Sequence, residues 1–114
     1  MTVRFNYIDE FAHRAKALAK KYKSFEADYT AFLDSMEENP YQGTSLGRGV
    51  YKTRMAITSK GKGKSGGARV LTYNIAESES GDIIVTLLSI FDKNEMDNVS
   101  DAYTSDLVRQ AKSL

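Results

Sequence analysis

Cysteine and tryptophan are absent from this sequence of 114 residues, and histidine and proline each occur once. Without cysteine there can be no disulfide, no thiolate nucleophile and no cysteine metal site. The single histidine, His13, lies off the apolar stripe of its predicted helix, so we expect it to be exposed. We expect no metal site and no cofactor. One histidine also excludes a two-histidine acid–base pair and leaves no convincing Ser-His-Asp triad.

Long apolar runs and a strong net charge are missing as well. No stretch approaches the roughly 20 apolar residues that span a bilayer, and the first residues lack the apolar core of a secretory signal. Charged residues make up 27% and hydrophobic residues 41% of the chain, which is typical of a folded protein. We therefore expect one domain over residues 1–114, located in the cytoplasm and not bound to a membrane.

Acidic residues are missing from the middle of the chain. Between Asn39 and Ala76 there is no Asp or Glu, and the basic residues there are Arg48, Lys52, Arg54, Lys60, Lys62, Lys64 and Arg69. A protein with a formal net charge of +1 thus concentrates its positive potential in one segment. Such a patch attracts a polyanion such as RNA.

The first 40 residues predict a strand and a helical hairpin. Residues 3–7 alternate apolar and polar side chains, as a half-buried strand does. We expect the two helices to join near Lys23, with Ser24 as the cap of the second helix and Asn39-Pro40 as its end. Helical spacing predicts their buried positions, which are Ile8, Phe11, Ala12, Ala15, Leu18, Ala19 and Tyr22, then Phe25, Tyr29, Phe32, Leu33 and Met36.

The pattern then changes to strands. Segments 50–58, 68–75 and 82–91 are rich in β-branched and aromatic residues. Turn residues at 59–67 and 77–81 separate them, which predicts an antiparallel meander. The last strand is almost continuously apolar, as expected of a central strand covered on both faces.

A final helix completes the predicted fold. Ser100 is its expected cap, and its apolar positions are Ala102, Tyr103, Leu107, Ala111 and Leu114. The order of elements is β-α-α-β-β-β-α. It predicts an α+β domain in which the helical hairpin and the C-terminal helix pack on a small twisted sheet.

Three cations should converge on one face of this sheet. Lys52 and Arg54 are two residues apart on one strand, so they project from the same face. Arg69 lies on the neighbouring strand. Like charges placed together repel one another, so folding alone gives little reason for this arrangement. A bound anion would neutralise the repulsion between these three cations.

The glycine-rich segment at 59–67 also resembles nucleotide-binding loops. Residues 61–66 fit G-x-G-x-x-G, and residues 63–65 fit the end of a Walker A motif. Both motifs require a following helix whose N-terminus meets the phosphates, whereas residues 68–74 predict a strand. We therefore do not expect nucleotide binding there.

Three segments carry motifs of a known family: residues 46–57, LGRGVYKTRMAI; residues 59–73, SKGKGKSGGARVLTY; and residues 87–95, LLSIFDKNE. The first resembles the first sheet strand of the RelE/HigB toxins, in the RelE/ParE superfamily. The second resembles the basic hairpin of the HigB-like branch. The third resembles the strand end usually written Y-x-K-x-E, with Phe91 where the family often has tyrosine. The predicted order of elements is also the family's.

The resemblance implies a toxin of a type II toxin–antitoxin system that cleaves mRNA in the ribosomal A site without a metal. The ribose 2′-hydroxyl would attack its own 3′-phosphate, leaving a cyclic phosphate and a free 5′-hydroxyl. This reaction needs a base, cations for the developing charge and an acid. The resemblance implies Lys52 as the base, Arg54 and Arg69 as the stabilising cations, and Lys93, oriented by Glu95, as the donor or a backbone contact.

Further residues are expected to bind RNA or the ribosome: Arg48, Lys60, Lys62, Lys64, Tyr73, Phe91 and Glu95. We expect the three lysines on a flexible tip, where they would bind phosphates as mobile charges. Tyr73 is the nearest substitute, by sequence, for the tyrosine missing at Phe91. The implied partners are a cognate antitoxin of the helix-turn-helix type, the 70S ribosome and mRNA. Operator DNA would be reached only through the antitoxin complex.

Two other functions remain open. Members of the ParE branch resemble this fold but poison DNA gyrase without catalysis. An RNA-binding module without catalysis is left open by Phe91. The basic face at Lys52, Arg54 and Arg69 favours the endonuclease, because a gyrase inhibitor needs no convergent phosphate site.

Overall fold

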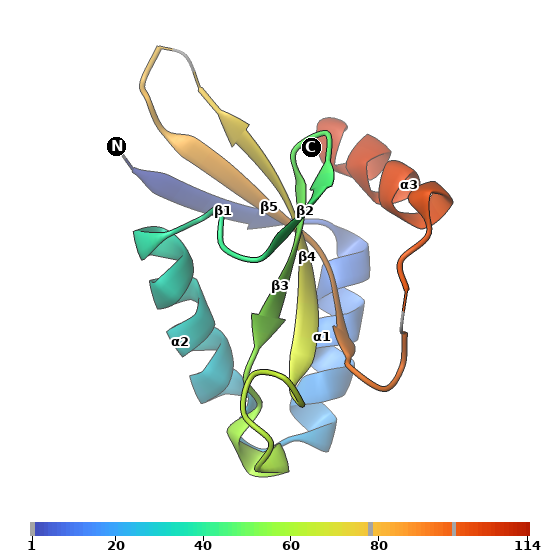
Figure 1. The fold of residues 1–114 in the computed structure, drawn as a ribbon. Coiled ribbons are helices and arrows are strands. Elements are labelled where there is room, and N and C mark those ends of the chain that lie inside the picture. Colours follow the sequence, from blue (N-terminus) through green and yellow to red (C-terminus); the bar gives the residue numbers. More distant parts are fainter. Residues whose placement is uncertain (1, 78, 97) are drawn as a thin grey trace.

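The structure, a computed structural model, describes residues 2–77, 79–96 and 98–114. Three helices and a five-stranded sheet confirm the predicted α+β class (Figure 1). The elements are β1 (Val3–Tyr7), α1 (Asp9–Lys21), α2 (Phe25–Glu38), β2 (Thr44–Gly47), β3 (Val50–Met55), the 3-10 turn η1 (Thr58–Lys60), β4 (Ala68–Ala76), β5 (Ile83–Asp92) and α3 (Asp101–Lys112).

The strands lie in the order β1-β5-β4-β3-β2. As predicted, β3, β4 and β5 form an antiparallel meander, while β1 runs parallel to β5. Because β5 lies between β1 and β4 and is buried along nearly its whole length, its almost continuous apolar sequence is explained. The prediction missed β2, a short and fully exposed edge strand that pairs with β3.

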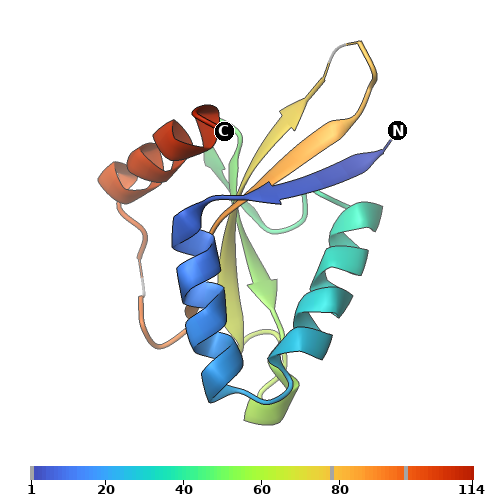
Figure 2. The same cartoon turned by 180° about the vertical axis from the view of Figure 1, so that it is seen from behind.

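The two faces of the sheet are covered differently. Helices α1 and α2 lie over one face, as the view from behind shows (Figure 2), and enclose the larger core. On the opposite face α3 packs against a smaller cluster, the α3 core: Ile8, Val50, Leu71, Leu88, Phe91 and Leu107. Val70 belongs to the larger core and its neighbour Leu71 to the α3 core, as alternation along a strand requires.

A β-bulge in β5 decides where Phe91 points. The pairing of β5 with β4 slips by one residue at Leu88. Leu87 and Ile90, on either side, both belong to the larger core, although residues three apart on a regular strand face opposite ways. The bulge therefore turns Phe91 toward the α3 face instead of under α1 and α2.

Most predicted helix ends are confirmed. The hairpin connection spans Lys23, α2 ends before Asn39-Pro40, and Ser100 accepts a hydrogen bond from the Tyr103 backbone N–H at 3.1 Å. Ser24 occupies the N-cap position of α2, as predicted, but its side chain makes no capping hydrogen bond. Its hydroxyl instead donates to Asp28 at 2.7 Å and accepts from the backbone N–H of Ser59 at 2.9 Å, which fastens α2 to η1, just before the glycine-rich loop.

Candidate active site

Arginines and an aromatic ring form one row across the open face of the sheet. Arg54 on β3 is paired with Arg69 on β4, and Arg69 is paired with Phe91 on β5. Side chains that are directly opposite in this way have Cβ atoms only about 5 Å apart. Lys52 lies on the same side of β3, one row further on. The structure thus brings the three predicted cations together.

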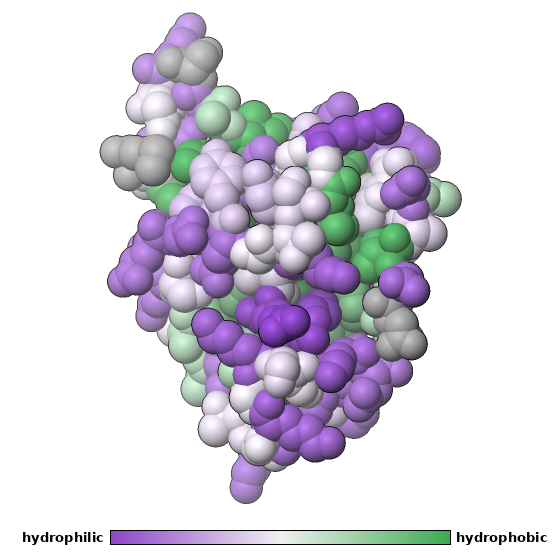
Figure 3. All heavy atoms as spheres, viewed as in Figure 1, coloured by the Kyte–Doolittle hydropathy of each residue, from purple (hydrophilic) through white to green (hydrophobic). Residues whose placement is uncertain are grey.

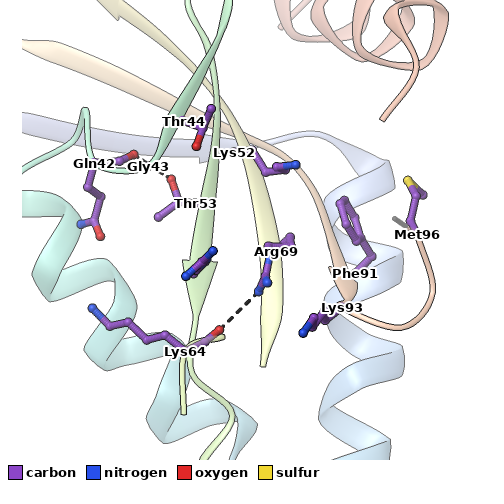
Figure 4. Close-up of a pocket in the computed structure, with 11 residues that line it drawn as sticks. Gln42, Gly43, Thr44, Lys52, Thr53, Lys64, Arg69, Phe91, Lys93 and Met96 are labelled. Carbon is purple, nitrogen blue, oxygen red and sulfur yellow. Dashed lines mark hydrogen bonds between the residues drawn. The ribbon is translucent and has the colours of Figure 1, made fainter. Parts of the chain in front are cut away.

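These residues line a cavity of about 550 Å³, the cationic cavity (Figure 4). In the space-filling view, hydrophilic side chains gather over the middle and lower part of this face (Figure 3). Every ionisable side chain among the described lining residues is a lysine or an arginine. The lining comprises Gln42, Gly43, Thr44, Lys52, Thr53, Arg54, Lys64, Arg69, Phe91, Lys93 and Met96.

The carbonyl groups of the glycine-rich loop orient Arg69. Its guanidinium donates to the carbonyl oxygens of Ser65 at 3.0 Å, Ala68 at 3.2 Å and Lys64 at 3.3 Å. Burial, and then the charge of Arg54, lower the pKa of Arg69 from its ordinary value. An arginine remains charged nonetheless, so its position beside Arg54 is electrostatically unfavourable until an anion binds.

Lys60 is not on a mobile tip, contrary to the prediction. Its side chain is only 9% exposed, and its ammonium group donates to Asp92 at 2.8 Å and to the carbonyl of Gly67 at 3.4 Å. The chain turns back through η1 at this point, which carries the side chain inward beneath the loop. The ammonium group of Lys60 is therefore not available to bind RNA directly.

The Lys60–Asp92 pair is closely surrounded. Tyr22 donates its hydroxyl to Asp92 at 2.5 Å, and the Asn94 backbone N–H donates at 3.1 Å. Burial alone would raise the pKa of Asp92, but the hydrogen bonds from Lys60, Tyr22 and Asn94 and the charge of Lys60 lower it to about 2. Asp92 is thus a carboxylate at any physiological pH.

The other two lysines of the loop are separated. Both side chains are exposed, but Lys64 lines the cationic cavity, whereas Lys62 is not among its lining residues. The three lysines were expected to act as one mobile group. They instead occupy three environments: buried, at the cavity and on the outer surface.

Two predicted binding residues lie elsewhere. Arg48 and Tyr73 line a second groove of about 610 Å³ between the β2–β3 hairpin and α3, together with Val108. Tyr73 is four residues from Arg69 on β4, which corresponds to about 13 Å along a strand. It cannot replace the tyrosine missing at Phe91, and that expectation is wrong.

Glu95 does not orient Lys93. One carboxylate oxygen of Glu95 accepts from the Asp92 backbone N–H at 2.8 Å, and the other lies 4.0 Å from Arg14. Glu95 therefore closes the turn after β5. Lys93 is fixed instead through its own backbone N–H, which donates to the carbonyl of Gly67 at 3.1 Å.

Several lining residues were missed from the sequence. Gln42, Gly43 and Thr44 precede and begin β2, and they reach the cavity only because β2 folds back along β3. Met96 follows β5 in an irregular segment. No periodic signal marks such positions. Among the described residues, no group of three or more His, Asp or Glu side chains lies close enough together to hold a metal ion.

Gly67 allows the loop to pass close to the end of β3. A Cβ atom at this position would overlap the carbonyl oxygen of Met55 and lie 3.0 Å from the Ile57 nitrogen. We predict that Gly67→Ala lowers the free energy of unfolding by about 1–3 kcal/mol, as overpacking does. Urea denaturation measures the change. Ser65→Ala, an exposed position of the same loop, should change it by less than about 0.5 kcal/mol, and equal effects would contradict the close approach.

An α+β fold that presents a cavity of converging cations defines a candidate phosphate-binding site, and comparison with known proteins supplies the family. The family model for the RelE toxin of the RelE/RelB toxin–antitoxin system matches residues 11–114. The chain therefore belongs to the RelE toxin family. No curated protein matches the sequence. None of the helices within the described residues is long and apolar enough to cross a membrane.

Proposed function

We propose that this protein is an mRNA endonuclease that acts on the ribosome, inhibits translation and is neutralised by a cognate antitoxin. The observation that carries the proposal is the cationic cavity, whose ionisable lining consists only of lysine and arginine. Its size suits a nucleotide-sized ligand. Membership of a toxin family supports the same conclusion.

The proposed chemistry uses side chains alone. The scissile phosphate would bind between Arg54 and Arg69, which grip its oxygens and stabilise the charge that develops. Lys52, in its neutral amine form, accepts the proton of the ribose 2′-hydroxyl on its Nζ lone pair as that oxygen bonds to phosphorus. The bond from phosphorus to the 5′-oxygen breaks, and Lys93 donates a proton to the departing oxygen. The products are a 2′,3′-cyclic phosphate and a 5′-hydroxyl.

The remaining assignments rest on the cavity lining, on the loop sequence and on the toxin family. Phe91 and Met96 form the apolar wall of the cavity. Phe91 is only 1% exposed, so a base can lie against the half-buried Met96 and not on the Phe91 ring. The glycine- and lysine-rich loop supports a place in the HigB-like branch. We further propose a helix-turn-helix antitoxin, the 70S ribosome and mRNA as partners, and a cytoplasmic location. Operator DNA would be contacted only through the antitoxin complex.

Phe91 favours a second candidate, an RNA-binding protein without catalysis. It has no hydroxyl group, and tyrosine is not among the described residues that line the cavity. A gyrase inhibitor is less well supported, because it would not require converging phosphate ligands. Purified protein incubated with mRNA on 70S ribosomes decides between the first two. Fragments that end in a cyclic phosphate support the endonuclease, and bound but intact mRNA supports the second candidate.

Expression without the antitoxin should stop growth by stopping translation. We predict that methionine incorporation falls before thymidine incorporation, because mRNA is the proposed target and DNA is not. Pulse labelling after induction measures both rates. A protein with Arg54 and Arg69 both replaced by alanine is the control and should affect neither rate. Thymidine incorporation falling first would contradict the proposal and favour gyrase poisoning.

The two exposed lysines of the loop, Lys62 and Lys64, should contribute to different steps, ribosome binding and cleavage. We predict that Lys62→Ala weakens ribosome binding and lowers its salt dependence by about one unit, since one phosphate contact is lost. Lys64→Ala should instead slow cleavage at saturating toxin, because Lys64 lines the cavity. Co-sedimentation across a salt series and single-turnover cleavage separate the two effects. Identical behaviour of the variants would contradict this division.

A further inference from the structure

A buried ion pair lies just outside the cationic cavity. Lys60 at the end of η1 and Asp92 at the end of β5 are 32 residues apart in sequence, and their side chains are 9% and 4% exposed. Tyr22, which follows α1, donates its hydroxyl to the same carboxylate. The pair therefore connects three separate parts of the chain at one point.

Both ends of the glycine-rich loop are fastened at this point. The loop begins after Lys60 and ends at Gly67. The carbonyl of Gly67 accepts from the Lys60 ammonium group at 3.4 Å and from the backbone N–H of Lys93 at 3.1 Å. Asp92 lies between Phe91 and Lys93, both of which line the cavity. A movement of the pair would thus displace the loop and the end of β5 together.

Between these two ends lie the groups that orient the site. Lys64 lines the cavity, and the carbonyl oxygens of Lys64 and Ser65 bind the Arg69 guanidinium (Figure 4). The segment is rich in glycine, which leaves its backbone unusually free. Its conformation must therefore be set by contacts from outside the segment.

Stability alone does not account for a buried ion pair at this place. Well-packed apolar side chains usually stabilise a protein as well as such a pair does, or better. A charged pair has fixed bond directions, which apolar contacts lack. We propose that the Lys60–Asp92 pair is a positioning element: it sets the glycine-rich loop so that the loop carbonyl oxygens hold Arg69 toward the phosphate. The part that concerns catalysis rests on the proposed function.

Two variants test this role. Lys60→Met removes the bonds to Asp92 and Gly67 at nearly constant side-chain length. Combining it with Asp92→Asn also removes the charge that would be left buried, while Tyr22 can still donate to the amide oxygen. The double variant should therefore regain most of the stability lost in the single variant. It should not restore the bonds from residue 60 to residue 92 and to the carbonyl of Gly67. Lys16→Met, at an exposed lysine of α1, is the charge control. Met36→Ala, in the core under α2, is the control for destabilisation.

The first measurement requires no activity. Amide hydrogen exchange of residues 61–67 and the NMR signals of the Arg69 side chain report the loop in the free protein. We expect at least tenfold faster exchange and an averaged guanidinium signal in both Lys60 variants, and neither change in the controls. If the folded double variant showed the wild-type exchange rates for residues 61–67 and the wild-type Arg69 signals, the proposal would be overturned, whether or not the protein cleaves mRNA.

The second measurement is single-turnover cleavage of ribosome-bound mRNA. Misplacement of about 1 Å can slow a reaction about 100-fold, so we expect both Lys60 variants to cleave 10- to 100-fold more slowly. The toxin concentration for half-saturation should stay within about threefold, and both controls should cleave at the wild-type rate. If Lys60→Met is unfolded, the double variant decides. Wild-type cleavage by the double variant would overturn the positioning role, whereas absence of cleavage by the wild-type protein would overturn the proposed function alone.

Discussion

Arg69→Ala should reduce mRNA cleavage about 100- to 1,000-fold, which is the usual cost of losing one donor to a transition-state charge. Arg54→Ala should have a similar effect, since the two residues are paired across β3 and β4. Neither change removes core volume, so both variants should remain folded. Single-turnover cleavage with ribosome-bound mRNA measures the loss, and circular dichroism checks the fold.

Two further variants give this prediction its controls. Arg4→Ala removes an arginine whose side chain is 63% exposed and that pairs only loosely with Asp82, at 3.4 Å, and it should cleave normally. Arg69→Lys keeps the charge but loses the planar fork that binds phosphate through two bonds, so its rate should lie between those of Arg69→Ala and the wild type. Folded Arg54→Ala and Arg69→Ala proteins that cleave at the wild-type rate would place the reaction elsewhere.

The convergence of Lys52, Arg54 and Arg69 could be predicted because it depends on local rules. Alternation along a strand puts Lys52 and Arg54 on one side of β3, and a short hairpin brings β4 beside it. Turn residues and apolar periodicity were enough to find both strands. The family motifs fell on the same residues, and the match over residues 11–114 confirmed the family.

The positions of Phe91 and Lys60 could not be predicted, because both depend on contacts between distant parts of the chain. The bulge at Leu88 is a property of how β5 pairs with β4, and the sequence of β5 is apolar on both sides of it. Lys60 appears in a run of glycine and lysine that is typical of a solvated loop. Its partner Asp92 is separated from it by two strands, and no short-range pattern relates the two residues.

Asp92→Asn should lower the free energy of unfolding by about 3–5 kcal/mol at neutral pH, because it leaves the Lys60 ammonium group buried without its counter-charge. The pKa of Asp92 gives an independent and smaller figure. It is about 2 in the folded protein and 3.8 ordinarily, and this difference corresponds to about 2 kcal/mol. The larger figure applies to the variant, since asparagine also replaces one of the two accepting oxygens with an NH2 group, which cannot accept the hydrogen bonds that Asp92 receives.

The same pair predicts how stability depends on pH. The folded protein binds a proton at Asp92 less readily than the unfolded chain does, so the contribution of Asp92 is complete above about pH 4. It is lost as the pH falls from 4 toward 2. Urea denaturation at pH 7, 4, 3 and 2 should therefore show a loss that is about 2 kcal/mol larger in the wild type than in Asp92→Asn. Both proteins share the loss that comes from Glu10 and Asp28, whose pKa values are also lowered by their hydrogen bonds. Asp34→Asn, at an exposed carboxylate of α2, should keep the wild-type profile. If Asp92→Asn lost as much stability between pH 4 and pH 2 as the wild type, Asp92 would not be a buried carboxylate bound by Lys60. The ion pair would then not hold the glycine-rich loop in place.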